Sequence, residues 1–503
     1  MEFRPARVCR ARVCMHSGRC AVGQKVCGHF IAGAWLEGPA APNVNPSDLD
    51  ETVGFYAQGG AGEARAAIAA ARAVFPAWSS CGLEPRLEIL DRIGAELIAR
   101  KAELGALLAR EEGKTLAEGT GEVGRAGQFF RYYAAEVLRL MGDAAESVRP
   151  GIEVQVRREP LGVIGIVTPW NFPAAIPAWK IAPALAYGNC VVFKPAELVP
   201  ASAWTLAEII GRSGLPAGVF NLVMGPGREV GQAIVESPQV DAITFTGSVE
   251  TGRRIARGAA ARMAKVQLEM GGKNPLVVLD DADLETAVSA AVNGAYFATG
   301  QRCTASSRLI VTEGIHDRFV EALLARMGEL RVGHALDPAS QIGPVVDEAQ
   351  LERNQSYLEI GTKEGARLAA GGQRLNRETR GHFMAPALFT EAHNGMRIAR
   401  EEIFGPIAAV VRVKDYEEAL SVANDTEFGL TAGIATTSLK YASHFRRHAQ
   451  AGCVMVNLPT AGTDYHVPFG GRKASSYGPR EQGAYAREFY TTVKTAYTLA
   501  GQV

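Results

Sequence analysis

Hydrophobic and polar residues follow different patterns in successive parts of the chain. Residues 63–142 carry apolar residues at spacings of three and four, as in EARAAIAAARAVFPAW, which predicts helices. Short apolar runs then alternate with helical segments; they are GVIGIVTP, NCVVFKP, VFNLVMG, DAITFTG and NPLVVLD. Such strands are typical of a parallel sheet covered by helices on both faces, which binds ligands at the carboxyl ends of its strands. The pattern therefore predicts a doubly wound α/β domain.

A second alternation of helices and strands begins near residue 283, with IHDRFVEALLARMGEL as a helix and CVMVNLP as a strand. It predicts a second α/β domain. Segments 147–162 and 488–500 predict a two-stranded ribbon and a terminal strand. Because isolated hairpins are marginal in water, we expect these segments to pair with each other or with another subunit.

The composition is that of an ordinary globular protein. Of the 503 residues, 47% are hydrophobic and 21% are charged, and the formal net charge is zero. Without a basic excess, a nucleic-acid or anionic-membrane partner has no electrostatic support, and no apolar run is long enough to predict a membrane span. Eight cysteines are too few for a disulfide scaffold of this length, which favours a reducing, cytoplasmic location.

Residues 1–27 differ from the rest of the chain, with five arginines, one lysine, a single acid and four of the cysteines. They lack the apolar stretch of a secretory signal and the CxxC pairs of a zinc site. A basic segment with few core residues cannot offset its ordering entropy, so we expect a disordered extension. A targeting segment and an over-long start are the alternatives.

Two residues are candidates for covalent catalysis. Cys303 lies in ATGQRCTAS, where a glycine, polar residues and the cation Arg302 replace the aliphatic neighbours of a core cysteine, and such surroundings favour a thiolate. Glu269 lies in LEMGGKNP, after an apolar strand and before two glycines that allow close approach of backbone or ligand. A carboxylate half-buried there has a raised pKa, which suits a general base near neutral pH.

Three further motifs follow apolar strands, and each has two interpretations. Asn171 in TPWNFP is a stiffened amide donor, as an oxyanion site requires, or a turn asparagine. Lys194 and Glu197 in FKPAE bind a ribose or form a surface ion pair. Gly247 and Ser248 in FTGSVETG begin a helix whose free N–H groups suit a pyrophosphate, or simply cap it.

Two weaker signals remain. The loop MGPGREVG, with Gly225, Gly227 and Gly231, is close to the dinucleotide fingerprint, but its third spacing is one residue too long. A phosphate loop and an ordinary strand–helix turn fit it equally. Glu402 and Phe404 in EEIFGPI lie on one side if the segment is extended, and a strand-end turn is the alternative.

The order of these motifs is more specific than any one of them. TPWNFP, FKPAE, FTGS, LEMGGKNP, GQRC, EEIFGP and PFGGRK together resemble the aldehyde dehydrogenase superfamily over roughly residues 28–500, and the separation of 34 residues between Glu269 and Cys303 matches the family's base and nucleophile. The resemblance implies that Cys303 attacks an aldehyde, that Asn171 and the Cys303 N–H hold the oxyanion, and that Glu269 activates the water that releases the acid.

The resemblance also implies a nicotinamide cofactor. NAD is expected, because the carboxylate of Glu197 accepts hydrogen bonds from a 2′-hydroxyl and repels a 2′-phosphate, while nearby Lys194 leaves NADP possible. The residues at the family's cofactor positions are Thr168, Pro169, Trp170, Lys180, Lys194, Glu197, Gly227, Phe245, Gly247, Ser248, Glu402 and Phe404. No metal is expected.

The implied fold has a Rossmann-type NAD(P)-binding domain (residues 28–145 and 163–282) and a catalytic domain (283–478). Residues 146–162 and 479–503 would form a small β oligomerisation element of a homodimer or homotetramer.

Within the superfamily, GQRCTASSRLIV and the segment from LPTAG onward look most like bacterial α-ketoglutarate semialdehyde (2,5-dioxovalerate) dehydrogenases. Succinate-semialdehyde dehydrogenases carry arginines where this chain has Trp179 and Phe297, which argues against a specialist for succinate semialdehyde. The candidates for holding a substrate carboxylate are Arg302 and His466, and Phe172 is a further substrate candidate. Succinate semialdehyde, lactaldehyde and betaine aldehyde are alternative substrates. A CoA-acylating enzyme would lack Glu269, which is present here. The alternative from a different class is a non-redox thioesterase-like or structural protein on this scaffold; loss of Cys303 or of the cofactor residues would indicate it, and neither is lost.

Overall fold

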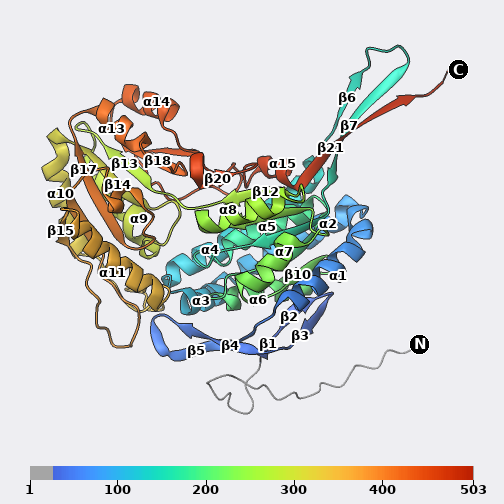
Figure 1. Ribbon diagram of the computed structural model, residues 1–503, viewed down its shortest axis with the longest axis horizontal. Coiled ribbons are helices and arrows are strands. Elements are labelled where there is room, and N and C mark those ends of the chain that lie inside the picture. The colour runs from blue at the N-terminus through green and yellow to red at the C-terminus, as the bar shows by residue number, and fades with distance from the viewer. Residues whose placement is uncertain (1–25, 502–503) are drawn as a thin grey trace.

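The computed structural model describes residues 26–501, and the colour gradient of Figure 1 follows the chain through them. The expected disorder of residues 1–25 lies outside the described residues. Val26–Cys27 form strand β1, which pairs in parallel with β5 (Asp48–Ala57). Ordered structure therefore begins before residue 28, earlier than the sequence predicts. β4 (Ala40–Asn45) completes this small sheet.

The sheet of the first domain has the strand order β20–β12–β11–β8–β9–β10–β2–β3. The strands from β12 to β10 are parallel, and the strands added at the two edges are antiparallel, which confirms the predicted doubly wound architecture. The bounds are β20 (Ser476–Tyr477), β12 (Lys265–Glu269), β11 (Ala242–Thr246), β8 (Val163–Val167), β9 (Cys190–Lys194), β10 (Phe220–Leu222), β2 (His29–Ile31) and β3 (Ala34–Leu36).

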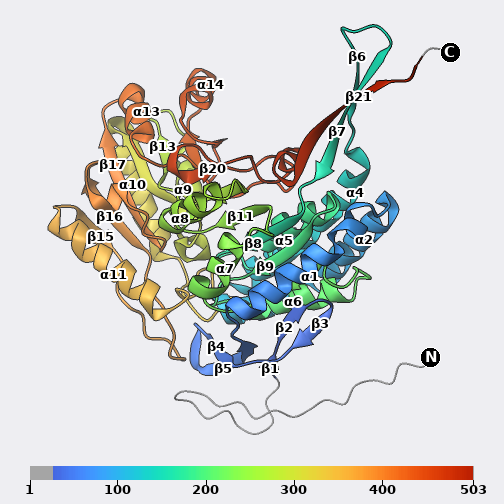
Figure 2. The same cartoon turned by 45° about the vertical axis from the view of Figure 1, so that its right-hand side comes forward.

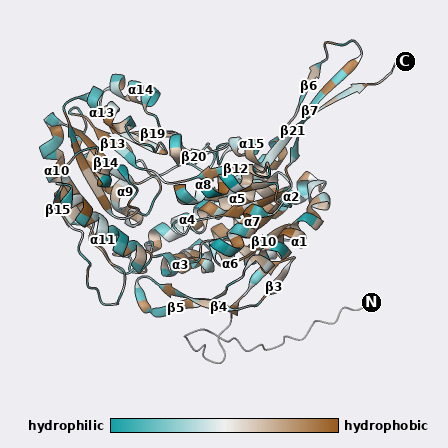
Figure 3. Cartoon of the chain, viewed as in Figure 1, coloured by the Kyte–Doolittle hydropathy of each residue, from teal (hydrophilic) through white to brown (hydrophobic). Residues whose placement is uncertain are grey.

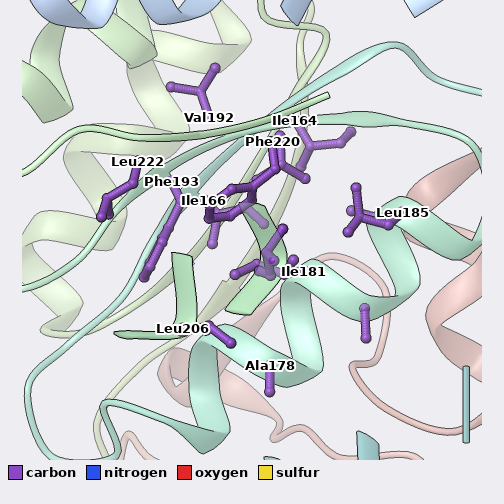
Figure 4. Packing of buried hydrophobic residues seen from close by; sticks show 14 of the residues in the cluster. Ile164, Ile166, Ala178, Ile181, Leu185, Val192, Phe193, Leu206, Phe220 and Leu222 are labelled. Carbon is purple, nitrogen blue, oxygen red and sulfur yellow. The ribbon is translucent and has the colours of Figure 1, made fainter. Parts of the chain in front are cut away.

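Helices cover both faces of this sheet, as Figures 1 and 2 show. Helices α1, α7 and α8 lie on one face, and α5 and α6 lie on the other with α2, α3 and α4 packed outside them. Figure 4 shows the strand residues Ile166 and Phe193 on the same side of the sheet as Ile181 of α5. The bounds are α1 (Ala61–Ser79), α2 (Leu83–Ala99), α3 (Lys101–Glu112), α4 (Leu116–Glu136), α5 (Ala175–Ala186), α6 (Pro200–Gly211), α7 (Gln232–Glu236) and α8 (Val249–Ala260).

The sheet of the second domain has the order β15–β16–β17–β14–β13–β18–β19, with β15 antiparallel at its edge. β13 (Asn274–Val278) belongs to this sheet, so the chain changes domain just after Glu269 and the predicted boundary at 282/283 comes too late. The other strands are β14 (Ser306–Thr312), β15 (Arg367–Ala370), β16 (Ala387–Ala392), β17 (Ile407–Val413), β18 (Thr431–Ala435) and β19 (Cys453–Val456). The helices are α9 (Leu284–Tyr296), α10 (Glu313–Gly328), α11 (Glu348–Lys363), α12 (Arg397–Arg400), α13 (Tyr416–Asn424) and α14 (Leu439–His448).

A three-stranded sheet projects from the first domain at the upper right of Figure 1. It consists of β6 (Asp143–Glu146), β7 (Ile152–Pro160) and β21 (Thr491–Leu499), so the two predicted segments do pair with each other. Residues 479–490 do not belong to it, because α15 (Arg487–Tyr490) packs against the first domain and buries its aromatic side chains there.

Apolar residues concentrate in the strands of both large sheets, whereas the helices around them mix polar and apolar residues (Figure 3). This distribution explains the uninterrupted apolar runs of the sequence, since both faces of these sheets are covered. Within residues 26–501, no helix combines the length and the apolar character that a membrane crossing requires.

Candidate active site

A cavity of about 500 Å³ lies between the two α/β domains. Cys303, Glu269 and Phe172 line it, together with Arg302. The aromatic side chains of Phe129, Trp179 and Phe469 form much of the remaining wall. The two candidate catalytic side chains, which come from different domains, therefore face the same cavity.

The backbone of Cys303 is fixed from two sides. The loop follows a turn, Phe297–Gly300, in which Ala298 and Thr299 have positive φ values of 51° and 57°. The side chain of Asn274 donates a hydrogen bond to the Cys303 carbonyl oxygen at 2.8 Å. A Cβ atom on Gly272 would lie 2.6 Å from the same oxygen, so the second glycine of LEMGGKNP permits this close approach.

Burial raises the pKa of the Cys303 thiol, and the carboxylates of Glu402 and Glu269 raise it further. The sequence pattern predicted that the adjacent Arg302 lowers the pKa of the Cys303 thiol. That guanidinium instead lies 3.4 Å from the carboxylate of Glu118, which offsets its charge. The surroundings of Cys303 therefore raise the pKa of its thiol, whereas the sequence pattern predicted a lowered pKa.

Glu269 ends β12 and is buried, with its Oε2 accepting a hydrogen bond from Ser476 Oγ at 2.5 Å. Burial raises the pKa of Glu269 well above its usual range, the nearby carboxylate of Glu481 raises it further, and the hydrogen bond from Ser476 lowers it.

Lys180 on α5 forms an ion pair with Glu481 and is fully buried. It therefore has no surface for a cofactor, and its assignment to the cofactor cleft is wrong.

Asn171 lies in the loop after β8, where its Nδ2 donates to the backbone oxygen of Gln301 at 2.9 Å. This bond joins the loop to the segment that carries Cys303. Lys114 donates to the backbone oxygen of Asn171 and forms an ion pair of 2.7 Å with Glu122. Glu122 also accepts hydrogen bonds from the backbone N–H groups of Ala174 and Ala175, at 2.9 and 3.1 Å, so TPWNFP is anchored firmly.

The carboxyl edge of the first sheet carries the predicted ribose residues. Lys194 Nζ lies 3.7 Å from the carboxylate of Glu197, whose Oε1 accepts a hydrogen bond from the Gly227 N–H at 2.9 Å. The loop MGPGREVG thus lies beside Glu197 and turns into a helix. Within residues 26–501, the hydroxyl oxygens of Thr168 and Thr246 at this edge are buried without a hydrogen-bond partner.

The predicted pyrophosphate motif is a helix N-terminus. Ser248 is the N-cap of α8 and accepts a hydrogen bond from the Thr251 N–H at 3.3 Å. Phe245 is buried, and a Cβ on Gly247 would lie 2.5 Å from its ring, so Phe245 supports the turn from beneath. The cap geometry leaves the exposed face of the turn open to a ligand.

Residues at the other end of the predicted cofactor site lie around the domain junction. The rings of Trp170 and Phe404 make an edge-to-face contact with centroids 5.3 Å apart, beside Pro169. Glu402 accepts a hydrogen bond from the Gly272 N–H at 2.8 Å, and burial raises its pKa.

Of the predicted substrate residues, Arg302 and Phe172 line the cavity, whereas His466 is exposed and does not. His466 follows Tyr465 in a surface loop, so its assignment is not supported. The sequence analysis missed lining residues on α4, among them Arg125 and Phe129. Their helical spacing was visible, but nothing in it indicated which face of α4 would meet a cavity.

The comparisons with known proteins agree with this geometry. Residues 35–496 match the profile of the Aldehyde dehydrogenase family. The chain is 44% identical to the alpha-ketoglutaric semialdehyde dehydrogenase of Bacillus subtilis over 93% of this chain and 97% of that protein. It is 41% identical to the alpha-ketoglutarate semialdehyde dehydrogenase of Haloferax volcanii, over 93% and 98% of the two chains.

A similar solved structure is the betaine aldehyde dehydrogenase of Staphylococcus aureus in complex with NAD+. Its TM-score is 0.92 at 33% identity, over 96% of each chain. Family match, relatives and fold all cover nearly the whole chain. The protein belongs to the aldehyde dehydrogenase family.

Proposed function

We propose that this protein oxidises α-ketoglutarate semialdehyde (2,5-dioxopentanoate) to 2-oxoglutarate, with NAD as the cofactor. The observation that carries the proposal is the shared cavity of Cys303 and Glu269. The two semialdehyde dehydrogenase relatives named above support the choice of substrate.

Cys303 is the proposed nucleophile. Its Sγ attacks the aldehyde carbon as a thiolate, the thiol proton having passed to solvent, and an Sγ–C bond forms. Asn171 and the backbone N–H of Cys303 stabilise the oxyanion; the Asn171 amide nitrogen makes one hydrogen bond within residues 26–501, to Gln301, which leaves its second N–H available. Because burial raises the pKa of the Cys303 thiol, the fraction of thiolate, and with it the rate of attack, is expected to increase as pH rises.

Glu269 is the proposed base of the second half-reaction. The thiohemiacetal carbon loses hydride and becomes a thioester of Cys303. Glu269 then removes a proton from water, the resulting hydroxide attacks the thioester carbon, and the Sγ–C bond breaks to release the carboxylic acid. The raised pKa of Glu269 suits this task, because a base of ordinary pKa would accept a proton from water less readily.

The carboxyl edge of the first sheet fits a dinucleotide. The exposed N-terminus of α8 at Ser248 and the hydroxyls of Thr168 and Thr246, which lack hydrogen-bond partners within residues 26–501, suit a polar, anionic ligand. We assign Lys194 and Glu197 to the ribose beside the adenine, and Glu402 and Phe404 to the nicotinamide end. Bound NAD supplies the hydride acceptor. The Glu197 carboxylate, half-exposed and beside this ribose position, favours NAD over NADP.

The projecting sheet of β6, β7 and β21 is the proposed oligomerisation element of a homodimer or homotetramer. Val493, Tyr497 and Leu499 of β21 are exposed large hydrophobic residues, which a second subunit would cover. We place the enzyme in the cytoplasm, because Cys81, Cys190, Cys303 and Cys453 are thiols outside any disulfide.

A panel of aldehydes tests the proposal. Purified wild-type protein is assayed with 2,5-dioxopentanoate, succinate semialdehyde, lactaldehyde and betaine aldehyde, each with NAD and with NADP, by the absorbance of the reduced nicotinamide. We expect the highest kcat/KM for 2,5-dioxopentanoate with NAD, and no turnover by Cys303→Ala. A higher kcat/KM for any other aldehyde would contradict the substrate assignment, and activity of Cys303→Ala would contradict the mechanism.

A further inference from the structure

One stripe of helix α4 faces the catalytic cavity. Glu118, Gly121, Glu122, Arg125 and Phe129 all line it, at the three- and four-residue spacings that bring side chains to one face of a helix. Gly121 lies one turn before Arg125, and a Cβ atom there would have no atom within 4 Å. The missing side chain leaves room beside Arg125.

Among residues 26–501, three cationic side chains line this cavity, and two of them are paired with carboxylates. Arg302 lies 3.4 Å from Glu118, and Lys114 lies 2.7 Å from Glu122. Arg125 has no such partner in the part of the chain that the structure describes, where it makes no ion pair or hydrogen bond. Arg125 therefore brings an uncompensated positive charge to the cavity.

The guanidinium of Arg125 is supported by an aromatic ring. It lies over Tyr465 with its central carbon 5.5 Å from the ring centroid. Tyr465 itself makes edge-to-face contacts with Phe129 and Tyr132, at 6.3 and 6.1 Å between centroids. Arg125 is half-buried, so an anion that reached it would be partly shielded from water. The side chain is thus held in place by packing and left without its own counter-ion.

We propose that Arg125 binds the carboxylate at the end of the substrate remote from the aldehyde and so selects acidic semialdehydes. A guanidinium presents two parallel N–H donors that match a carboxylate, and a partly desolvated site strengthens the pair. The inference rests on the proposed function, and it supplies the carboxylate ligand that Arg302 and His466 do not. It also predicts discrimination against betaine aldehyde, whose fixed cation is repelled by an unpaired arginine.

The test uses two aldehydes that differ only in the remote group, 5-oxopentanoate and pentanal, together with 2,5-dioxopentanoate. For Arg125→Met, we expect kcat/KM for the two acids to fall about 10- to 100-fold, mainly through KM, as for loss of a hydrogen-bonded charge pair. The value for pentanal should stay within about twofold of the wild type. Arg125→Lys keeps the charge without the planar fork and should recover part of the loss.

Arg131→Met is the matched control. Arg131 is on the same helix, is exposed and pairs with Asp91 at the surface, so its loss should leave all three values unchanged. Equal losses for acids and pentanal in Arg125→Met, or no loss for either, would overturn the inference while the proposed function stood. A wild-type protein that oxidised none of the three aldehydes would instead refute the proposed function, and the inference with it.

Discussion

The hydrogen bond from Ser476 to Glu269 allows the proposed role of Glu269 as the base to be tested directly. Ser476 Oγ donates to Glu269 Oε2 at 2.5 Å, and the bond stabilises the ionised carboxylate. The other charged groups that act on this carboxylate are Glu481, Lys180 and Arg480. Replacing Ser476 by alanine removes a hydrogen-bond donor that stabilises the ionised form of Glu269 and not its protonated form. The pKa of Glu269 should therefore rise further.

The size of that rise follows from the strength of the bond. A hydrogen bond to a charged group contributes about 1.5–3 kcal/mol, and one pKa unit corresponds to about 1.4 kcal/mol. Loss of the bond is therefore expected to raise the pKa of Glu269 by about 1–2 units. Glu269 works as a base in its ionised form. The acidic limb of the kcat profile should accordingly move to higher pH by the same amount.

The assay is kcat for 2,5-dioxopentanoate with saturating NAD, measured across the pH range in which the acidic limb falls. Ser476→Thr retains the hydroxyl and is the control, with little shift expected. Glu481→Gln removes the like charge that raises the pKa of Glu269, so its acidic limb should move to lower pH. Acidic limbs that coincide in Ser476→Ala and wild type, or a shift of Glu481→Gln to higher pH, would refute the assignment of Glu269 as the titrating base.

Three further predictions concern the rest of the site. Asn171→Ala should lower kcat by about 10²–10³-fold, as for loss of one oxyanion donor, and a change confined to KM in steady-state assays would contradict that role. Lys180→Met should destabilise the protein by about 3–5 kcal/mol, because Glu481 becomes an uncompensated buried charge. Thermal unfolding should show that adding Glu481→Leu restores most of the lost stability, and an unchanged melting temperature in Lys180→Met would contradict the prediction. Glu197→Ser should shift the ratio of kcat/KM values from NAD toward NADP, and an unaltered ratio would exclude Glu197 from cofactor choice.

The fold was largely predictable because its sheets are buried on both faces. Uninterrupted apolar runs marked the parallel strands of the first sheet. The same feature explains the misplaced domain boundary, since NPLVVLD is equally apolar whichever sheet it joins. Only the pair Gly271–Gly272, where backbone and side chains of the second domain approach closely, marks the passage between the sheets. The local sequence pattern of β13 did not indicate which of the two sheets this strand joins.

The site was predictable where its chemistry lies in short motifs and not where it depends on distant partners. Cys303 and Glu269 were found from their own neighbours. The burial of Lys180 depends on Glu481, 301 residues further along, and so escaped local reasoning. The charge of Arg302 was offset by Glu118, 184 residues away. Arg125 carries no motif, and its significance appears only when α4 is seen against the cavity.

A single-turnover experiment on Glu269→Gln tests the central claim, that Cys303 forms a thioester which Glu269 hydrolyses. Cys303 and Asn171 remain in place, so rapid mixing with NAD and 2,5-dioxopentanoate should give a burst of NADH close to one per active site. Steady turnover should then be about 10²–10⁴-fold slower than in the wild type, as for loss of a general base. Hydroxylamine should accelerate it, and mass spectrometry should find the acyl group on the Cys303 peptide. The absence of a burst, with an unmodified Cys303 peptide, would contradict the account.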